Sequence, residues 1–268
     1  MRTALVDNGS LEPAAHAGLR SAAARISERA GIPVDAVSWR HSDRAAPGGP
    51  ARTLAPWIRS WLSQGERDFL IVPFLISPGG AVGSALRADL EALAAEAGGF
   101  GFAVTQGLSE DALADVVADR VREALAARGL RRPPVIVVDH GGPSRASAAV
   151  RDAVAKGARE RLGGCVGPVA AASMEAPEGA SRGFSRPLLR DALASPGFAS
   201  GDVLIAPLFL SPGRHAGPDG DLARIARRAQ ERSAGLRCHF TDLAGSHPAA
   251  IGALAGALAE ALGAGALP

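Results

Sequence analysis

Short apolar runs rich in β-branched residues alternate along this chain with longer segments in which apolar residues recur every three to four positions. The first pattern is typical of buried strands and the second of amphipathic helices. Strands and helices in regular alternation predict parallel strands joined by crossover helices. The pattern therefore predicts an α/β fold.

The predicted elements form four strand–helix units in each half of the chain. In the first half the predicted strands are Ala4–Asp7, Val34–Ser38, Phe69–Leu75 and Phe102–Thr105, and the helices are Ala14–Ala30, Thr53–Ser63, Val82–Ala97 and Glu110–Arg128. In the second half the strands are Val135–Asp139, Val166–Ala171, Val203–Phe209 and Cys238–Thr241, and the helices are Arg145–Leu162, Ser185–Leu193, Gly220–Ser233 and Pro248–Leu262.

The two halves resemble each other in sequence as well as in pattern. LVDNGS, beginning at Leu5, aligns with VVDHGG, beginning at Val137, at an offset of 132 residues. LIVPFLISPGG, beginning at Leu70, aligns with LIAPLFLSPGR, beginning at Leu204, at an offset of 134 residues. Two offsets that nearly agree indicate an internal duplication. Gly129 and the following proline pair mark the boundary, so we expect lobes at residues 1–130 and 131–268, each a four-stranded parallel sheet flanked by helices.

Composition narrows the class of protein. The 268 residues are 47% hydrophobic, enough to bury one large or two modest cores. With 29 basic and 27 acidic side chains, a net charge of +2 gives no sign of a nucleic-acid partner. Two distant cysteines indicate neither a disulfide framework nor a zinc site. No apolar run reaches the ~18 residues of a membrane span, and the first ten residues lack the core of a signal peptide, so we expect a cytoplasmic protein without a membrane partner.

Candidate chemistry lies just after the predicted strands, because ligands of open parallel sheets bind beyond the carboxyl ends of the strands. His140 follows one strand of the second half and His215 follows another, while Glu175 follows a third. Neighbouring strands lie ~4.8 Å apart, so their loops can bring these side chains together. Two imidazoles and a carboxylate suit either a divalent transition metal or proton transfer, and the sequence leaves both roles open.

The loops around the two histidines are rich in glycine and carry basic side chains. Such loops, which expose backbone N–H groups before a helix, are suited to bind anions. The candidate substrate-binding residues are Gly141, Ser144 and Arg145 in the first loop, and Ser211, Gly213 and Arg214 in the second. A substrate carrying several carboxylates would fit them, whereas no phosphate-binding GxxxxGK[ST] motif is present.

Each candidate also has a structural explanation. A loop histidine is more often a polar residue at the rim of a site than a functional one, and we expect this of His16, His41, His239 and His247. The Ser-Pro-Gly segments can serve only as turns, and the arginines can be a solvated charged rim. His140 and His215 differ because both occupy equivalent strand ends inside glycine loops.

The chain resembles the sirohydrochlorin chelatases, a family of anaerobic cobalt chelatases and sirohydrochlorin ferrochelatases of the class II chelatase type, and the resemblance covers both halves. The motifs that carry the resemblance are DHGGPS from Asp139, SMEAP from Ser173 and PLFLSPGRHAGPDGDL from Pro207. The resemblance implies two lobes with the tetrapyrrole in the cleft between them. It also implies that His140 and His215 bind the metal and take protons from the pyrrole nitrogens, with Glu175 as a third metal-binding and catalytic participant.

The same resemblance implies a lyase of cobalamin or siroheme biosynthesis that takes Co²⁺, Fe²⁺ or Ni²⁺ as a substrate and needs no tightly bound cofactor. The histidine pair, however, is absent from the first lobe, where Asn8 and Ala81 stand at the equivalent positions and Asp43 matches Glu175. An active site in the second lobe explains this pattern. A tetrapyrrole or metal carrier without activity explains it too, as does a small-molecule binding module, and both a monomer and a homodimer remain open.

Overall fold

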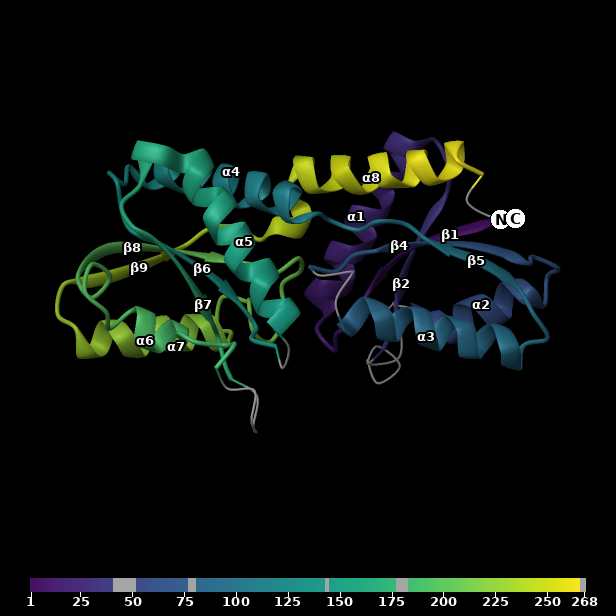
Figure 1. Ribbon diagram of the computed structural model, residues 1–268, viewed down its shortest axis with the longest axis horizontal. Coiled ribbons are helices and arrows are strands. Elements are labelled where there is room, and N and C mark those ends of the chain that lie inside the picture. The colour runs from purple at the N-terminus through teal and green to yellow at the C-terminus, as the bar shows by residue number, and fades with distance from the viewer. Residues whose placement is uncertain (41–51, 77–80, 143–144, 177–182, 266–268) are drawn as a thin grey trace. The chain divides into compact units, whose positions relative to one another are not determined.

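The computed structural model describes residues 1–40, 52–76, 81–142, 145–176 and 183–265 of the chain. They form two compact units (Figure 1). The first unit combines Met1–Ser109 with Pro248–Pro268, and the second is Glu110–His247. Each unit is built around its own parallel sheet, so the predicted α/β class is confirmed.

The first sheet has the strand order β3-β2-β1-β4-β5, and all its described pairings are parallel. Its strands are β1 (Arg2–Asp7), β2 (Val34–Ser38), β3 (Arg52–Thr53), β4 (Asp68–Pro73) and β5 (Gly101–Val104). The helices of this unit are α1 (Pro13–Ala30), α2 (Leu54–Leu62), α3 (Ala81–Glu96) and α8 (Pro248–Gly263). Helices α2 and α3 cover one face of the sheet, and α1 and α8 lie on the other (Figure 1).

The second sheet has the strand order β7-β6-β8-β9, again with parallel pairings. Its strands are β6 (Val135–Asp139), β7 (Val169–Ser173), β8 (Gly201–Pro207) and β9 (Leu236–Phe240), and its helices are α4 (Glu110–Arg128), α5 (Arg145–Leu162), α6 (Leu189–Ala192) and α7 (Asp221–Arg232). Helices α4 and α5 cover one face and α6 and α7 the other (Figure 1). The central strands β6 and β8 are almost fully buried, as their near-continuous apolar sequence predicts.

The predicted elements agree with the structure in type, and the differences lie mainly at their ends. Four strands were predicted for each sheet, but the first sheet has a fifth, β3, which pairs with the end of β2. Two residues are too few to show a period in sequence, so this strand could not be read from the pattern. In the second unit, α6 is only four residues long, whereas nine were predicted, and β7 begins at Val169 rather than Val166.

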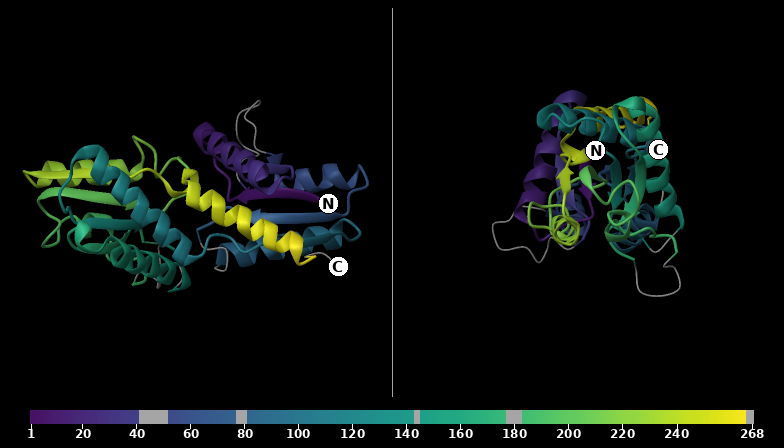
Figure 2. Two further views of the ribbon diagram at one scale, coloured as in Figure 1. Left: turned by 90° about the horizontal axis from the view of Figure 1, so that it is seen from above. Right: turned by 90° about the vertical axis from the view of Figure 1, so that its left-hand side faces the viewer.

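The compact units differ from the two halves of the sequence repeat. The predicted boundary at residues 130 and 131 follows the duplication, but α4, the last helix of the first half, packs in the second unit. Its Ala114 approaches Gly157 of α5 so closely that a Cβ on this glycine would lie 2.8 Å from the Cβ of Ala114. Conversely, α8 packs with α1 in the first unit, and Figure 2, seen from above, shows it lying over the first sheet. Each half of the repeat therefore contributes its last helix to the unit built mainly from the other half.

Two further expectations concern the cysteines and the membrane. Cys165 and Cys238 are both free, as their spacing predicted, and burial raises the pKa of the Cys238 thiol to about 11. In the described part of the chain, no helix is long and apolar enough to cross a membrane.

Candidate active site

Two histidines from adjacent strands face each other in the second unit. His140 directly follows β6, and His215 lies in the loop after β8, the strand that pairs with β6 along one edge. Their ring centroids are 4.7 Å apart and the rings are nearly perpendicular. Adjacent parallel strands end at the same edge of the sheet, which is why residues 75 positions apart in sequence meet here.

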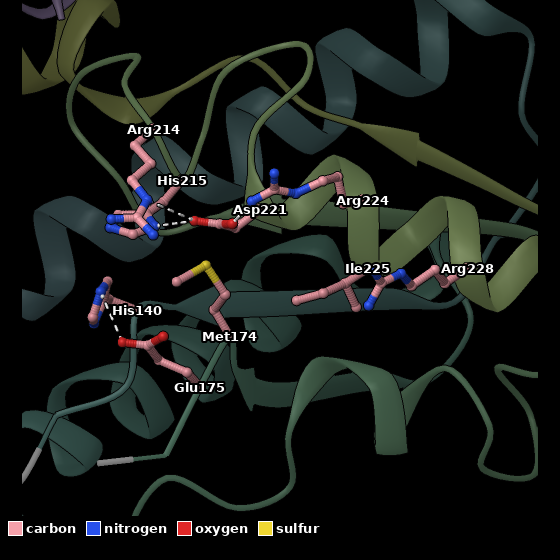
Figure 3. Close-up of a pocket in the computed structure, with 9 residues that line it drawn as sticks. All are labelled: His140, Met174, Glu175, Arg214, His215, Asp221, Arg224, Ile225 and Arg228. Carbon is pink, nitrogen blue, oxygen red and sulfur yellow. Dashed lines mark hydrogen bonds and ion pairs between the residues drawn. The ribbon is translucent and has the colours of Figure 1, made fainter. Parts of the chain in front are cut away.

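Each histidine has a carboxylate close to one of its ring nitrogens. Of the two histidines, His140 is the more exposed. Its Nδ1 lies 3.0 Å from the backbone oxygen of Gly141, and its Nε2 lies 3.3 Å from Glu175 Oε1. A carbonyl oxygen can only accept a hydrogen bond, so this contact assigns the proton to Nδ1. The basic nitrogen, Nε2, therefore faces both the pocket and the carboxylate of Glu175 (Figure 3).

His215 is held by Asp221, the first residue of α7. His215 Nδ1 lies 2.6 Å from Asp221 Oδ2, so Nδ1 donates its proton to the carboxylate and Nε2 is left as the basic nitrogen. Burial by itself raises the pKa of Asp221, but the hydrogen bond from His215 and the ion pair with Arg224 outweigh it and hold this pKa below its ordinary value. Asp221 is therefore an anion across the physiological range and fixes the orientation of the imidazole.

The loop that carries His215 folds back on the start of α7. The backbone N–H of Asp221 donates to Arg214 O at 3.2 Å, and that of Leu222 donates to His215 O at 3.1 Å. Gly220 makes this approach feasible, because a Cβ there would lie 2.7 Å from His215 O. The contact between His215 and Asp221 is thus built into the backbone of the loop.

A buried polar network supports the loop that carries His140. The Ser173 hydroxyl donates to Asp139 Oδ1 at 2.5 Å and accepts from Arg151 Nη1 at 2.6 Å, and Arg151 is only 2% exposed. Burial raises the pKa of Asp139, and the Ser173 hydrogen bond and the charge of Arg151 offset this only in part. The backbone N–H of Glu175 also donates to His140 O at 3.1 Å, which ties the ends of β6 and β7 together.

The two histidines lie at one end of an open pocket of about 540 Å³, a size suited to a small-molecule ligand. Its lining residues are His140, Met174, Glu175, Arg214, His215, Asp221, Arg224, Ile225 and Arg228, all of the second unit (Figure 3). Met174 and Ile225 form an apolar patch between the histidines and the arginines of α7. In the part of the chain described, no three His, Cys, Asp or Glu side chains are grouped so that they alone could hold a metal ion.

The structure places the predicted site residues in three groups. His140, Glu175, His215 and Arg214 line the pocket. Gly141, Ser211 and Gly213 are in the surrounding loops without lining it, and Arg145, the first residue of α5, lies over the ring of Phe184. Ser144 lies outside the described residues. Catalytic, metal-binding and substrate-binding roles for these residues stay predictions.

Sequence reasoning missed five lining residues: Met174, Asp221, Arg224, Ile225 and Arg228. Met174 directly precedes Glu175, so its position after a strand could have drawn attention to it. The other four lie on α7, and Asp221 could have been noticed as an acidic residue six positions after a candidate histidine. Their direction toward the pocket depends on how the helix packs, which no local pattern encodes.

The remaining histidines do not all behave as predicted. His16 and His247 are 2% and 6% exposed, so the expectation that they lie at a polar rim was wrong for both. His16 is one of the buried residues of α1, and His247 directly precedes α8. His239 is half-buried and pairs with Asp202, and His41 is outside the described residues.

The first unit keeps the loop architecture without the histidine pair. Gly9 has a positive φ and its N–H donates to Asp7 Oδ1 at 2.9 Å, as Gly141 has a positive φ after Asp139. Asn8, the counterpart of His140, is exposed at the end of β1. Ala81, the counterpart of His215, begins α3, and Asp43 is outside the described residues. Among the described residues, only those of the second unit bring two histidines together at the ends of its strands.

Two units with parallel sheets, each with helices on both faces, and a histidine pair at the strand ends of the second define an α/β protein with a candidate ligand site at the edge of one sheet. Residues 2–124 match the model of the CbiX family. The match covers most of the first half of the repeat, whereas the pocket lies in the second. No curated protein matches the chain.

Three solved structures share the fold over nearly the whole chain. SirB from Bacillus subtilis with Fe³⁺ has a TM-score of 0.66 at 14% identity, with 97% of this chain and 95% of that chain covered. The sirohydrochlorin chelatase SirB from Bacillus subtilis subspecies spizizenii, in complex with cobalt, has a TM-score of 0.66 at 13% identity, with 98% of each chain covered. CbiX, described as the terminal enzyme for biosynthesis of siroheme in denitrifying bacteria, has a TM-score of 0.63 at 19% identity, with 97% and 99% covered. The resemblance to the sirohydrochlorin chelatases is thereby confirmed at the level of the fold and the CbiX match.

Proposed function

We propose that the protein inserts a divalent metal ion, cobalt or iron, into sirohydrochlorin or a related carboxylated tetrapyrrole, in cobalamin or siroheme biosynthesis. The observation that carries the proposal is the pair formed by His140 and His215, whose rings lie 4.7 Å apart at the end of an open pocket. The fold shared with SirB and CbiX supports the choice of reaction.

Metal insertion has a chemical requirement that this pair meets. A macrocycle that takes up a divalent ion must release two pyrrole N–H protons, so the reaction needs bases beside the incoming metal. His140 Nε2 can take one proton and share it with Glu175 Oε1, 3.3 Å away. His215 Nε2 can take the other, and the carboxylate of Asp221 at Nδ1 stabilises the imidazolium that forms.

The same two atoms, His140 Nε2 and His215 Nε2, can bind the metal ion before they accept the pyrrole protons. Neutral imidazole and carboxylate are good ligands for first-row transition metals. Because the ion must pass on to the macrocycle, the ring nitrogens would supply its other ligands.

An anaerobic absorbance assay with sirohydrochlorin and Co²⁺ tests the proposal. We expect wild type to accelerate metallation over the uncatalysed control, and His140→Ala with His215→Ala to lower the rate by about 10²-fold or more, the usual contribution of a general base. Asn8→Ala is the matched control, since it removes the side chain at the equivalent strand end of the first unit.

Two results would contradict the proposal. A tetrapyrrole spectrum of bound macrocycle without acceleration would mean that the protein carries its ligand and does not metallate it. A loss of activity in Asn8→Ala that exceeds the loss in the histidine variants would place the chemistry in the first unit.

A further inference from the structure

Helix α7 directs two arginines into the same pocket as the histidine pair. Arg224 and Arg228 are four residues apart, so they lie on one face of the helix about one turn from each other. Ile225 lies between them on the pocket side (Figure 3). The three side chains present a basic edge beside an apolar surface.

The charges of the pocket are not balanced. Both lining carboxylates are already engaged: Glu175 with His140, and Asp221 with His215 and Arg224. Arg228 makes no ion pair or hydrogen bond with any residue that the structure describes, although it lines the pocket. Within the described part of the chain, its guanidinium is therefore a cation without a partner, and it offers several hydrogen-bond donors to a ligand in the pocket.

Arg227 provides the contrast. It is the neighbour of Arg228 on the same helix and is similarly exposed, but it does not line the pocket and lies 3.5 Å from Asp219. Helix geometry turns consecutive residues by about 100°, which separates the two side chains. Among the described residues, the pocket-facing charge of α7 that has no partner is thus that of Arg228.

We propose that Arg228, assisted by Arg224, is a carboxylate subsite that makes the pocket selective for macrocycles with acidic side chains at their edge. The inference rests on the proposed function and specifies which part of the substrate α7 binds, namely the carboxylates at the edge of the macrocycle. An apolar ring face can pack against Met174 and Ile225 while a peripheral carboxylate reaches the guanidinium of Arg228. A guanidinium binds a carboxylate through two parallel hydrogen bonds, a geometry that a neutral ester cannot match.

Binding of the metal-free macrocycle, followed by its fluorescence, tests this subsite without requiring metal insertion. Wild type, Arg228→Gln and the matched control Arg227→Gln are titrated with sirohydrochlorin and with its methyl ester. We expect Arg228→Gln to weaken binding of the acid about tenfold, the usual effect of losing one charge-assisted contact. Arg227→Gln should bind as wild type does, and the ester should bind wild type and Arg228→Gln equally weakly.

Steady-state metallation by the same variants adds a second readout. Arg228→Gln should raise KM with a much smaller change in kcat, because the subsite contacts substrate and transition state alike. Inorganic phosphate, as a competitor, should displace little of the acid, since it lacks the apolar ring. Equal binding of the acid by Arg228→Gln and Arg227→Gln would overturn the subsite while leaving the chelatase proposal intact. Failure of wild type to bind any macrocycle would overturn both.

Discussion

Gly141 offers a direct test of how the loop geometry holds the site. Its φ is 94°, and a Cβ at this position would lie 2.0 Å from the backbone oxygen of Glu175 and 3.2 Å from Ser173 Cβ. Gly141→Ala must therefore strain the backbone and push away the segment that carries Glu175. Strain of this kind costs about 1–3 kcal/mol. Loss of the hydrogen bond from Glu175 N to His140 O adds about 1 kcal/mol.

The expected result is a loss of about 2–4 kcal/mol in unfolding free energy, together with a slower metallation rate as Glu175 leaves His140. Urea titration should be followed by far-UV circular dichroism, because all three tryptophans, Trp39, Trp57 and Trp61, lie in the first unit. Gly163→Ala is the control. Gly163 also has a positive φ, 50°, but a Cβ there meets nothing within 4 Å.

The control should lose only about 1 kcal/mol, the cost of placing alanine in a left-handed conformation, and should metallate as wild type does. If Gly141→Ala matched Gly163→Ala in both stability and rate, the close approach of the two strand-end loops would not matter, and the account of how they position Glu175 would be wrong.

Three further outcomes follow from the same contacts. Asp221→Asn should slow metallation tenfold or more, because His215 loses its anionic partner; an unchanged rate would rule out this positioning role. Arg151→Met should cost about 3 kcal/mol in a urea titration, since it leaves Asp139 buried without its cation; a loss below about 1 kcal/mol would show that the network is dispensable. The pKa of Asp202 is held well below its ordinary value by hydrogen bonds from Arg237 and His239, so its contribution to stability is present above about pH 4 and is lost as the pH falls below it. The difference in melting temperature between wild type and Asp202→Asn should therefore shrink from pH 6 to pH 3, and a difference that grew would reverse this sign.

The repeat explains why the second unit can carry a site by itself. Both units place an aspartate, a variable residue and a positive-φ glycine at the end of their first strand. The variable residue is Asn8 in one and His140 in the other. The shared backbone supplies the geometry, and the identity of a few strand-end residues decides whether that geometry presents groups that can move protons.

The position of the histidine pair could be predicted from sequence because it depends on one general property of parallel sheets. Strand periodicity located the ends of β6 and β8, and adjacent strands end together, so His140 and His215 had to lie near each other once their strands were neighbours. The α/β class and the internal duplication followed from local periodicity and from matched segments in the same way.

Tertiary packing decided the features that local patterns cannot encode. An amphipathic helix shows which of its faces is apolar but not which sheet that face will cover, so the packing of α4 in the second unit and α8 in the first was not visible in sequence. Asp221, Arg224 and Arg228 reach the pocket only because the loop after β8 folds back through Gly220 onto the start of α7. The sequence by itself thus determined the strand ends and the histidines they carry, while long-range packing determined which charged side chains surround them.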